Sequence, residues 1–192
     1  GILEISNASA LGATARGSVL SGTFVDQGAA LHIVGGASIG DFLLAEQLAL
    51  GSSSGSGEAT IQLVSGSATI ANPFELAGDS AIEALSGELL LDDTTESSGV
   101  AMITLGSSCG LSNTCSLRIG GNSSGESGTV KTFLDSSAAS GSDGINLGSQ
   151  KLTINNNGAF RISGASTISG EVLIDSGDLQ LAHVDALQSS QI

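Results

Sequence analysis

Short runs of alternating apolar and polar residues recur along the chain. Leu152 and Ile154 alternate with Lys151 and Thr153, a period of two that places successive side chains on opposite faces of a strand. Each run ends in Gly, Ser, Asn or Asp, which favour tight turns. The pattern predicts an all-β protein of short strands. The clearest predicted strands and their turns lie at residues 30–36, 59–66, 151–158, 159–164 and 171–177.

One segment also fits a helix. Residues 41–51, DFLLAEQLALG, place leucines at helical spacing and end in Gly. Because the segments on both sides are predicted strands, we expect strand here as well.

Composition narrows the choice of architecture. The chain has 28 Gly, five Phe, one Pro and neither Trp nor Tyr, whereas 40% of it is apolar. A β-sandwich uses longer strands and aromatic anchors, but a parallel β-solenoid needs only a thin core of stacked aliphatic residues. We therefore predict one β-solenoid unit over residues 1–192, with a sandwich as the alternative. Coils of about twenty residues would give about nine or ten coils, or about 45 Å of length.

The first and last segments share a motif. Residues 1–11 and 177–187 both read Gly-x-Leu-x-aliphatic-x-x-x-x-Ala-Leu, 176 positions apart. One interpretation is coincidence in a Gly-, Ala- and Leu-rich chain. The other is a repeat of about 176 residues, in which 177–192 begin the next unit. Strand-like ends without caps favour the second interpretation. The expected end-to-end contacts are Ile2, Leu3, Ile5, Leu179 and Leu181.

These segments also resemble a known family. GILEISNASALGA resembles the Gly-Thr-Leu-x-aliphatic-x-x-x-x-Ala-Leu-Gly segment of autotransporter-associated β-strand repeats, and residues 177–189 match it more loosely because Gln188 replaces the last Gly. Residues 70–91 are similar to a second stretch of that family, whereas 97–149 depart from it. The resemblance implies a right-handed parallel β-helix displayed outside a bacterial cell. It implies no particular activity, since such scaffolds carry adhesins, enzymes and spacers alike.

Charge excludes two classes of partner. Nineteen Asp and Glu oppose five Lys and Arg, for a formal charge of −14. Such a chain repels nucleic acids and anionic lipids, and no apolar run approaches the ~20 residues of a membrane span. We expect no nucleic-acid partner, no membrane insertion of this segment and no signal peptide within it.

The two cysteines, Cys109 and Cys115, are separated by five residues that include Gly and Asn. This spacing allows a local disulfide, which would indicate an oxidising, extracellular compartment. Two unpaired thiols are the alternative. A metal site would need two more ligands, so we expect neither a metal nor another cofactor.

Candidate catalytic groups are few. Asp92, Asp93 and Glu96 form the densest acidic cluster, and glycoside hydrolysis needs two carboxylates across a sugar. The cluster follows a strand and precedes Ser-Ser-Gly, which favours a solvated turn. His32 is expected on the outer face of a strand, and His183 occupies the motif position of Asn7.

The sequence therefore predicts a non-catalytic extracellular structural solenoid. It would form a stiff rod, fibre or surface stalk by end-to-end stacking or tandem repetition, with another copy as its partner. A carbohydrate-active β-helix enzyme and an adhesin that binds surface glycans are the alternatives.

Overall fold

A computed structural model describes residues 1–11, 22–38, 41–45, 47–52, 55–92, 101–109, 115–120, 127–132 and 144–187. The regular elements in these residues are all β-strands, which confirms the predicted all-β class. This described part accordingly contains no helix with the length and hydropathy needed to cross a membrane.

The strands stack in three rows, and all the strand pairings are parallel. Row 1 begins with β1 (Ile2–Ile5), β3 (Ala30–Val34), β6 (Ala59–Ser65), β9 (Ser80–Ala84) and β12 (Leu117–Ile119). Row 2 begins with β4 (Leu43–Leu44), β7 (Ser67–Ile70), β10 (Glu88–Leu91) and β13 (Thr129–Thr132). Row 3 comprises β2 (Thr23–Val25), β5 (Leu48–Leu50), β8 (Phe74–Leu76), β11 (Ile103–Leu105), β14 (Asn146–Gly148) and β16 (Thr167–Ile168). The long strands β15 (Leu152–Ile162) and β17 (Val172–Leu181) each run through rows 1 and 2.

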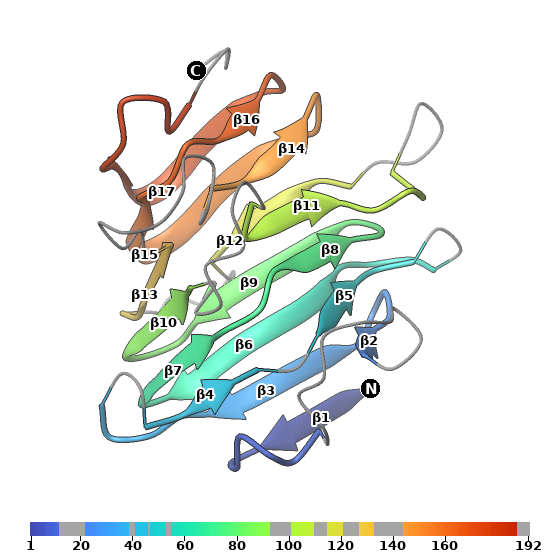
Figure 1. Cartoon of the computed structure of the whole chain (residues 1–192), viewed down its shortest axis with the longest axis vertical. Coiled ribbons are helices and arrows are strands. Elements are labelled where there is room, and N and C mark those ends of the chain that lie inside the picture. Colours follow the sequence, from blue (N-terminus) through green and yellow to red (C-terminus); the bar gives the residue numbers. More distant parts are fainter. Residues whose placement is uncertain are drawn as a thin grey trace.

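The chain visits the rows in turn and then returns to row 1 one level higher. The levels rise from the N-terminus at one end to the C-terminus at the other (Figure 1). Parallel neighbours separated by a full circuit are characteristic of a solenoid-like arrangement, whereas a sandwich is built from antiparallel strands.

The predicted number of coils is wrong. In the described residues, row 1 contains seven levels, which places its ends about 30 Å apart at ~4.8 Å per level. The circuits are longer than expected: Ser80 pairs with Leu117, 37 positions later, although Leu152 pairs with Val172 only 20 positions later. Circuits of 37 residues use more chain per level than the twenty residues that the prediction assumed.

Several predicted strands are confirmed. Residues 30–36 and 59–66 contain β3 and β6, and 41–51 form β4 and β5 and not a helix. The predicted strands at 151–158 and 159–164 are one strand, β15, whose pairing register shifts at Asn155 where the chain passes from row 1 to row 2.

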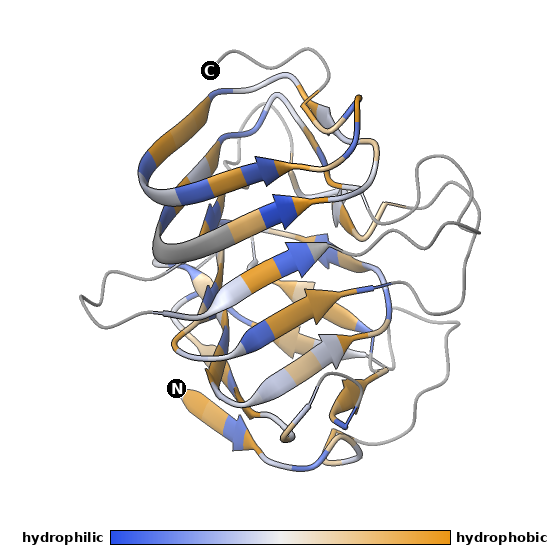
Figure 2. Ribbon diagram, turned by 90° about the vertical axis from the view of Figure 1, so that its left-hand side faces the viewer, coloured by the Kyte–Doolittle hydropathy of each residue, from blue (hydrophilic) through white to orange (hydrophobic). Residues whose placement is uncertain are grey.

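The core consists mainly of aliphatic side chains stacked in register, and Phe42, Phe74 and Phe160 are buried among them. Hydrophobic and hydrophilic residues alternate along the strands (Figure 2), and each inward position lies over an inward position of the level below. Burying one such Leu or Ile side chain contributes about 1.5–3 kcal/mol. The longest stack in row 1 is Leu3, Leu31, Ile61, Ile82, Ile119, Ile154 and Ile174.

Stacked glycines form the corner between rows 1 and 2. Gly66 and Gly87 have φ values of +79° and +85°, a region that side chains disfavour. A Cβ atom added at Gly87 would lie 1.7 Å from the carbonyl oxygen of Gly66 in the level below. The sharp corner therefore requires glycine both for its dihedral angle and for the approach of the two backbones.

We expect Gly87→Ala to destabilise the protein more than Gly57→Ala. Both positions have positive φ, which costs about 1–2 kcal/mol with a side chain, but an added Cβ at Gly57 meets only ordinary contacts at 3.6 Å. Gly1→Ala, with no atom within 4 Å of the added Cβ, is the neutral control. Urea unfolding followed by circular dichroism measures the three values. Equal losses for Gly87→Ala and Gly57→Ala would contradict the close-approach argument.

Candidate functional site

Exposed large apolar side chains gather at the two ends of the stack. In the described residues, the lower end surface consists of Ile2, Leu3, Phe24 and Leu43, on the first strands of the three rows. The upper end surface consists of Leu173, Ile174, Leu181 and Val184, on β17 and the turn after it. No large hydrophobic residue of the intervening levels in this part of the chain is similarly exposed.

The row 1 stack that runs from Leu3 to Ile174 explains why apolar side chains are exposed at both ends. Its five middle members are at most 1% exposed, whereas Leu3 and Ile174 are 52% and 43% exposed. Leu3 and Ile174 occupy inward positions, in register with buried residues. Their exposure therefore reflects an uncovered cross-section of the core at each end.

The backbone is open at the same places. Within the described residues, β1 pairs only with β3, and β17 pairs only with β15. The outer edge of each strand presents N–H and C=O groups that can pair with a further strand. Neither strand contains Lys or Pro, two residues that commonly protect an exposed edge.

The predicted contact residues divide between the end surfaces and the interior. Ile2, Leu3 and Leu181 are exposed at the ends. Ile5 is only 4% exposed, and Leu179 packs partly against the core. The motif does not point to the other exposed side chains of the two end surfaces, which are Phe24, Leu43, Leu173, Ile174 and Val184. Phe24 and Leu173 lie on outward positions of their strands, whereas Ile174 is an inward residue that is exposed because its strand is the last of the stack.

The two copies of the motif make the same turn. After β1, the Asn7 Oδ1 atom accepts a hydrogen bond from the Ser9 N–H (2.8 Å), and the Ala10 N–H donates to the Asn7 carbonyl (3.0 Å). After β17, the His183 Nδ1 atom accepts from the Asp185 N–H (3.0 Å). The residue that follows Asp185, an alanine, donates to the His183 carbonyl (3.1 Å). His183 therefore acts as a turn residue in the position of Asn7.

An ion-pair network on the side of the body connects three levels. The Arg118 guanidinium on β12 extends past the small Ala81 and donates to Glu58, with Nη2 2.6 Å from Oε2. Its Nη2 atom also lies 2.9 Å from Oε1 of Glu83, whose Oε2 atom accepts a hydrogen bond from Gln62 (2.6 Å). Burial by itself would lower the pKa of Arg118, but the bonds and charges of the two carboxylates outweigh it and raise this pKa. The network fixes one level against the next.

Only one member of the predicted acidic cluster, Asp92, lies within the described residues. Asp92 is half-buried at the end of β10, where its N–H donates to the carbonyl of Ile70 (3.0 Å). Asp93 and Glu96 lie outside the described residues. His32 is half-buried on the outer side of β3. No three His, Cys, Asp or Glu side chains in the described ranges are placed to hold a metal ion.

A disulfide joins Cys109 and Cys115, whose Cα atoms are 5.7 Å apart. It connects the chain after β11 in row 3 to the start of β12 in row 1. The Cys109 N–H donates to the Gly106 carbonyl (3.0 Å), and the Cys115 N–H donates to Oε1 of Gln150 (3.1 Å). The bond therefore ties the last strand of one level to the first strand of the next.

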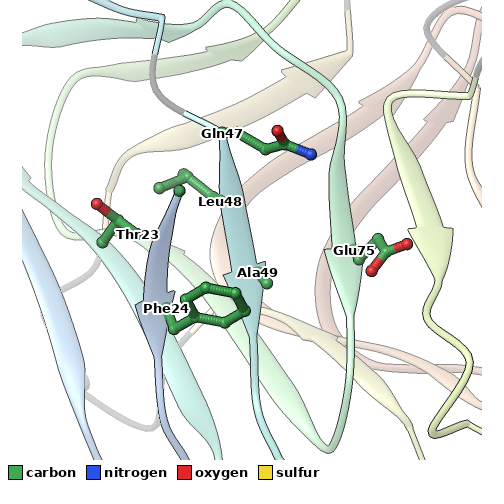
Figure 3. Close-up of a pocket in the computed structure, with 7 residues that line it drawn as sticks. Thr23, Phe24, Gln47, Leu48, Ala49 and Glu75 are labelled. Atoms are coloured by element: carbon green, nitrogen blue, oxygen red, sulfur yellow. The ribbon is translucent and has the colours of Figure 1, made fainter. Parts of the chain in front are cut away.

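A shallow hollow lies on the outer side of row 3, near the lower end (Figure 3). Phe24, Ala49 and Glu75 occupy successive outward positions there, and the small Ala49 leaves the space between the aromatic ring and the carboxylate. Gln47 and Thr23 complete its polar rim. An aromatic face beside polar groups is a feature of sugar-binding sites, but the hollow offers a single ring.

Comparison of the chain with protein-family models, with curated proteins and with solved structures found no match. The resemblance to autotransporter-associated repeats therefore stays a prediction that depends on the motifs alone.

Removing the Arg118 side chain should destabilise the fold. Arg118→Met leaves the buried Glu83 carboxylate without its cation but with its hydrogen bond from Gln62, and we expect a loss of about 1–3 kcal/mol in the free energy of unfolding. The matched control is Lys151→Met, because the Lys151–Glu171 pair is exposed and such pairs contribute about 0–1 kcal/mol. Urea unfolding measures both. Glu83→Gln added to Arg118→Met should restore part of the loss, and a loss no larger than that of the control would contradict the role of the network.

Proposed function

We propose that this protein is a non-catalytic structural β-solenoid that forms a rod, fibre or stalk by joining copies end to end. The observation that carries the proposal is the gathering of exposed large apolar side chains on the two end surfaces, next to open strand edges. Leu3 and Ile174 are core positions left uncovered at the two ends, and large exposed apolar patches mark sites for a partner. A second copy supplies both an apolar cross-section and a strand edge.

The energetic gain from joining comes from covering the ends. Each Leu, Ile or Phe side chain that becomes fully buried contributes about 1.5–3 kcal/mol, and new backbone pairs extend the parallel rows. The association entropy and the ordering of side chains offset part of this gain. Several apolar side chains at each end are therefore needed, and those that face the core, Leu3 at one end and Ile174 and Leu181 at the other, are the first to be covered.

The interior is suited to a mechanical role. Rows of parallel strands and a continuous aliphatic stack run from one end to the other, and the Arg118 network links three levels. The disulfide supports an extracellular location, since such bonds persist in oxidising compartments. Right-handed winding, a bacterial surface and membership of the autotransporter-associated repeats complete the proposal, on the strength of the sequence motifs.

Glycan binding at the hollow beside Phe24 is the second candidate function, favoured by the ring and the Glu75 carboxylate. A glycan array tests it, and Glu75→Gln should abolish any signal that arises there. Because Glu75 is not part of the lower end surface, this substitution should leave assembly unchanged. A carbohydrate-active enzyme remains the other alternative, and Asp92→Asn with Asp93→Asn should abolish a polysaccharide-cleaving activity if there is one.

End-to-end assembly predicts that charges on the upper end surface keep the copies apart. Leu173→Lys with Leu181→Lys should abolish fibres or oligomers in electron microscopy and sedimentation, because lysine at these positions would have to be desolvated. The matched control is Ser65→Lys, an exposed residue in the middle of the body, which should assemble as the native chain does. A native chain that remains monomeric at high concentration, or a double variant that still assembles, would refute the proposal.

A further inference from the structure

We propose that residues 177–187 are the joining segment between copies. In the joint, residues 177–187 of one copy lie below β3 of the next copy. They take the place that residues 1–11 occupy below β3 in a single copy. This inference rests on the proposed end-to-end assembly, and it specifies the partner, a second copy of this unit, and the way it docks.

Both motif copies direct the same positions toward the core. Leu3 pairs with Leu31 of the next level, which is buried. Leu179, 176 positions after Leu3, pairs with Phe160 of the level below, which is also buried. The inward and outward alternation of the two strands therefore agrees. A strand placed one residue out of step would turn its apolar side chains outward.

The agreement continues beyond the strands. The two turns share their hydrogen bonds, made by Asn7 in one copy and His183 in the other. Leu11 and Leu187, the last residues of the two motif copies, both pack against the core. Residues 1–11 and 177–187 are thus the same structural element, once at the start of the stack and once at its end.

The joining segment has leucines at the two positions that would pair with inward residues of β3. With 177–187 in place of 1–11, Leu179 and Leu181 would lie below Leu31 and Ile33 of the second copy. The exposed Leu181 would then be covered on the side that is open in the single copy. β1, which would be replaced, is held weakly, because three of its four residues are exposed.

The joint turns the second copy by one row. β1 lies in row 1, whereas residues 178–181 lie in row 2, because β17 has already passed the corner at Gly177. Row 1 of the second copy therefore continues row 2 of the first copy. By the same turn, row 3 of the second copy, which begins with β2, continues row 1 of the first copy. Phe24 and Leu173, both exposed on outward positions, come to lie in one row of side chains. The joint therefore accounts for two apolar residues that the motif itself does not contain.

The joint can be distinguished from simple stacking by a cysteine pair. Glu4 pairs with His32 in the single copy, so Gln180, 176 positions after Glu4, should lie next to His32 of the second copy. Neighbouring parallel strands are ~4.8 Å apart, within the range that a disulfide spans. The full chain with Gln180→Cys and His32→Cys, oxidised after assembly, should give a ladder of disulfide-linked multimers on a non-reducing gel. Gln180→Cys alone should give at most dimers.

A second pair reports the competing arrangement. In simple stacking, with row 1 on row 1, β1 of the second copy lies over the first half of β17. Leu173→Cys with Glu4→Cys would then give the ladder, and Gln180→Cys with His32→Cys would not. That outcome overturns the joining segment but leaves end-to-end assembly in place.

If the native chain does not assemble, the proposed function is refuted but the joint is still untested. A double chain then tests the joint. It consists of residues 1–187 followed directly by 12–192, with Gln180→Cys in the first copy and His32→Cys in the second. We expect an internal disulfide and a single cooperative unfolding transition. A matched chain without the joining segment, 1–176 followed by 12–192, should unfold in two transitions. A folded double chain that forms no such disulfide, or that unfolds as its matched chain does, overturns the inference.

Discussion

The structure depends on one constraint, which is that each level must present its inward residues in register with those of the level below. The parallel backbone pairing sets the spacing of the levels, and the stack that runs from Leu3 to Ile174 fills the space between the rows. Neither feature can form alone, because a shift of one residue in the pairing would direct the aliphatic side chains to solvent. The corners, ion pairs and end surfaces are all consequences of this stacking.

The constraint explains which features the sequence predicts well. Alternation with a period of two is a local signal, so β3 and β6 are predicted at nearly their true bounds, and the strand assignment of residues 41–51 follows from their neighbours. The aliphatic composition agrees with a core made mainly of Leu, Ile, Val and Ala, although Phe42, Phe74 and Phe160 are buried in it as well. The local pattern is sufficient for these features, because each strand needs only one apolar face toward the core.

Features that depend on the position of a level are not predicted. Nothing in the local pattern shows that 37 residues separate Ser80 from its partner Leu117, and this is why the coil count is wrong. Leu3 and Ile174 read like residues of covered strands, and their place at the two ends of the stack exposes them. The Arg118 network likewise depends on Ala81 and on Glu58, which is 60 positions earlier. Such a long-range coincidence leaves no short-range trace in the sequence.

The turn shared by Asn7 and His183 has a consequence for which residues this position accepts. An amide oxygen in one copy and an imidazole nitrogen in the other accept the same kind of backbone hydrogen bond. The position therefore requires a side-chain acceptor and not one residue type. A turn of the same shape can accordingly be specified by different residues, and a comparison of residue identities alone would not detect it.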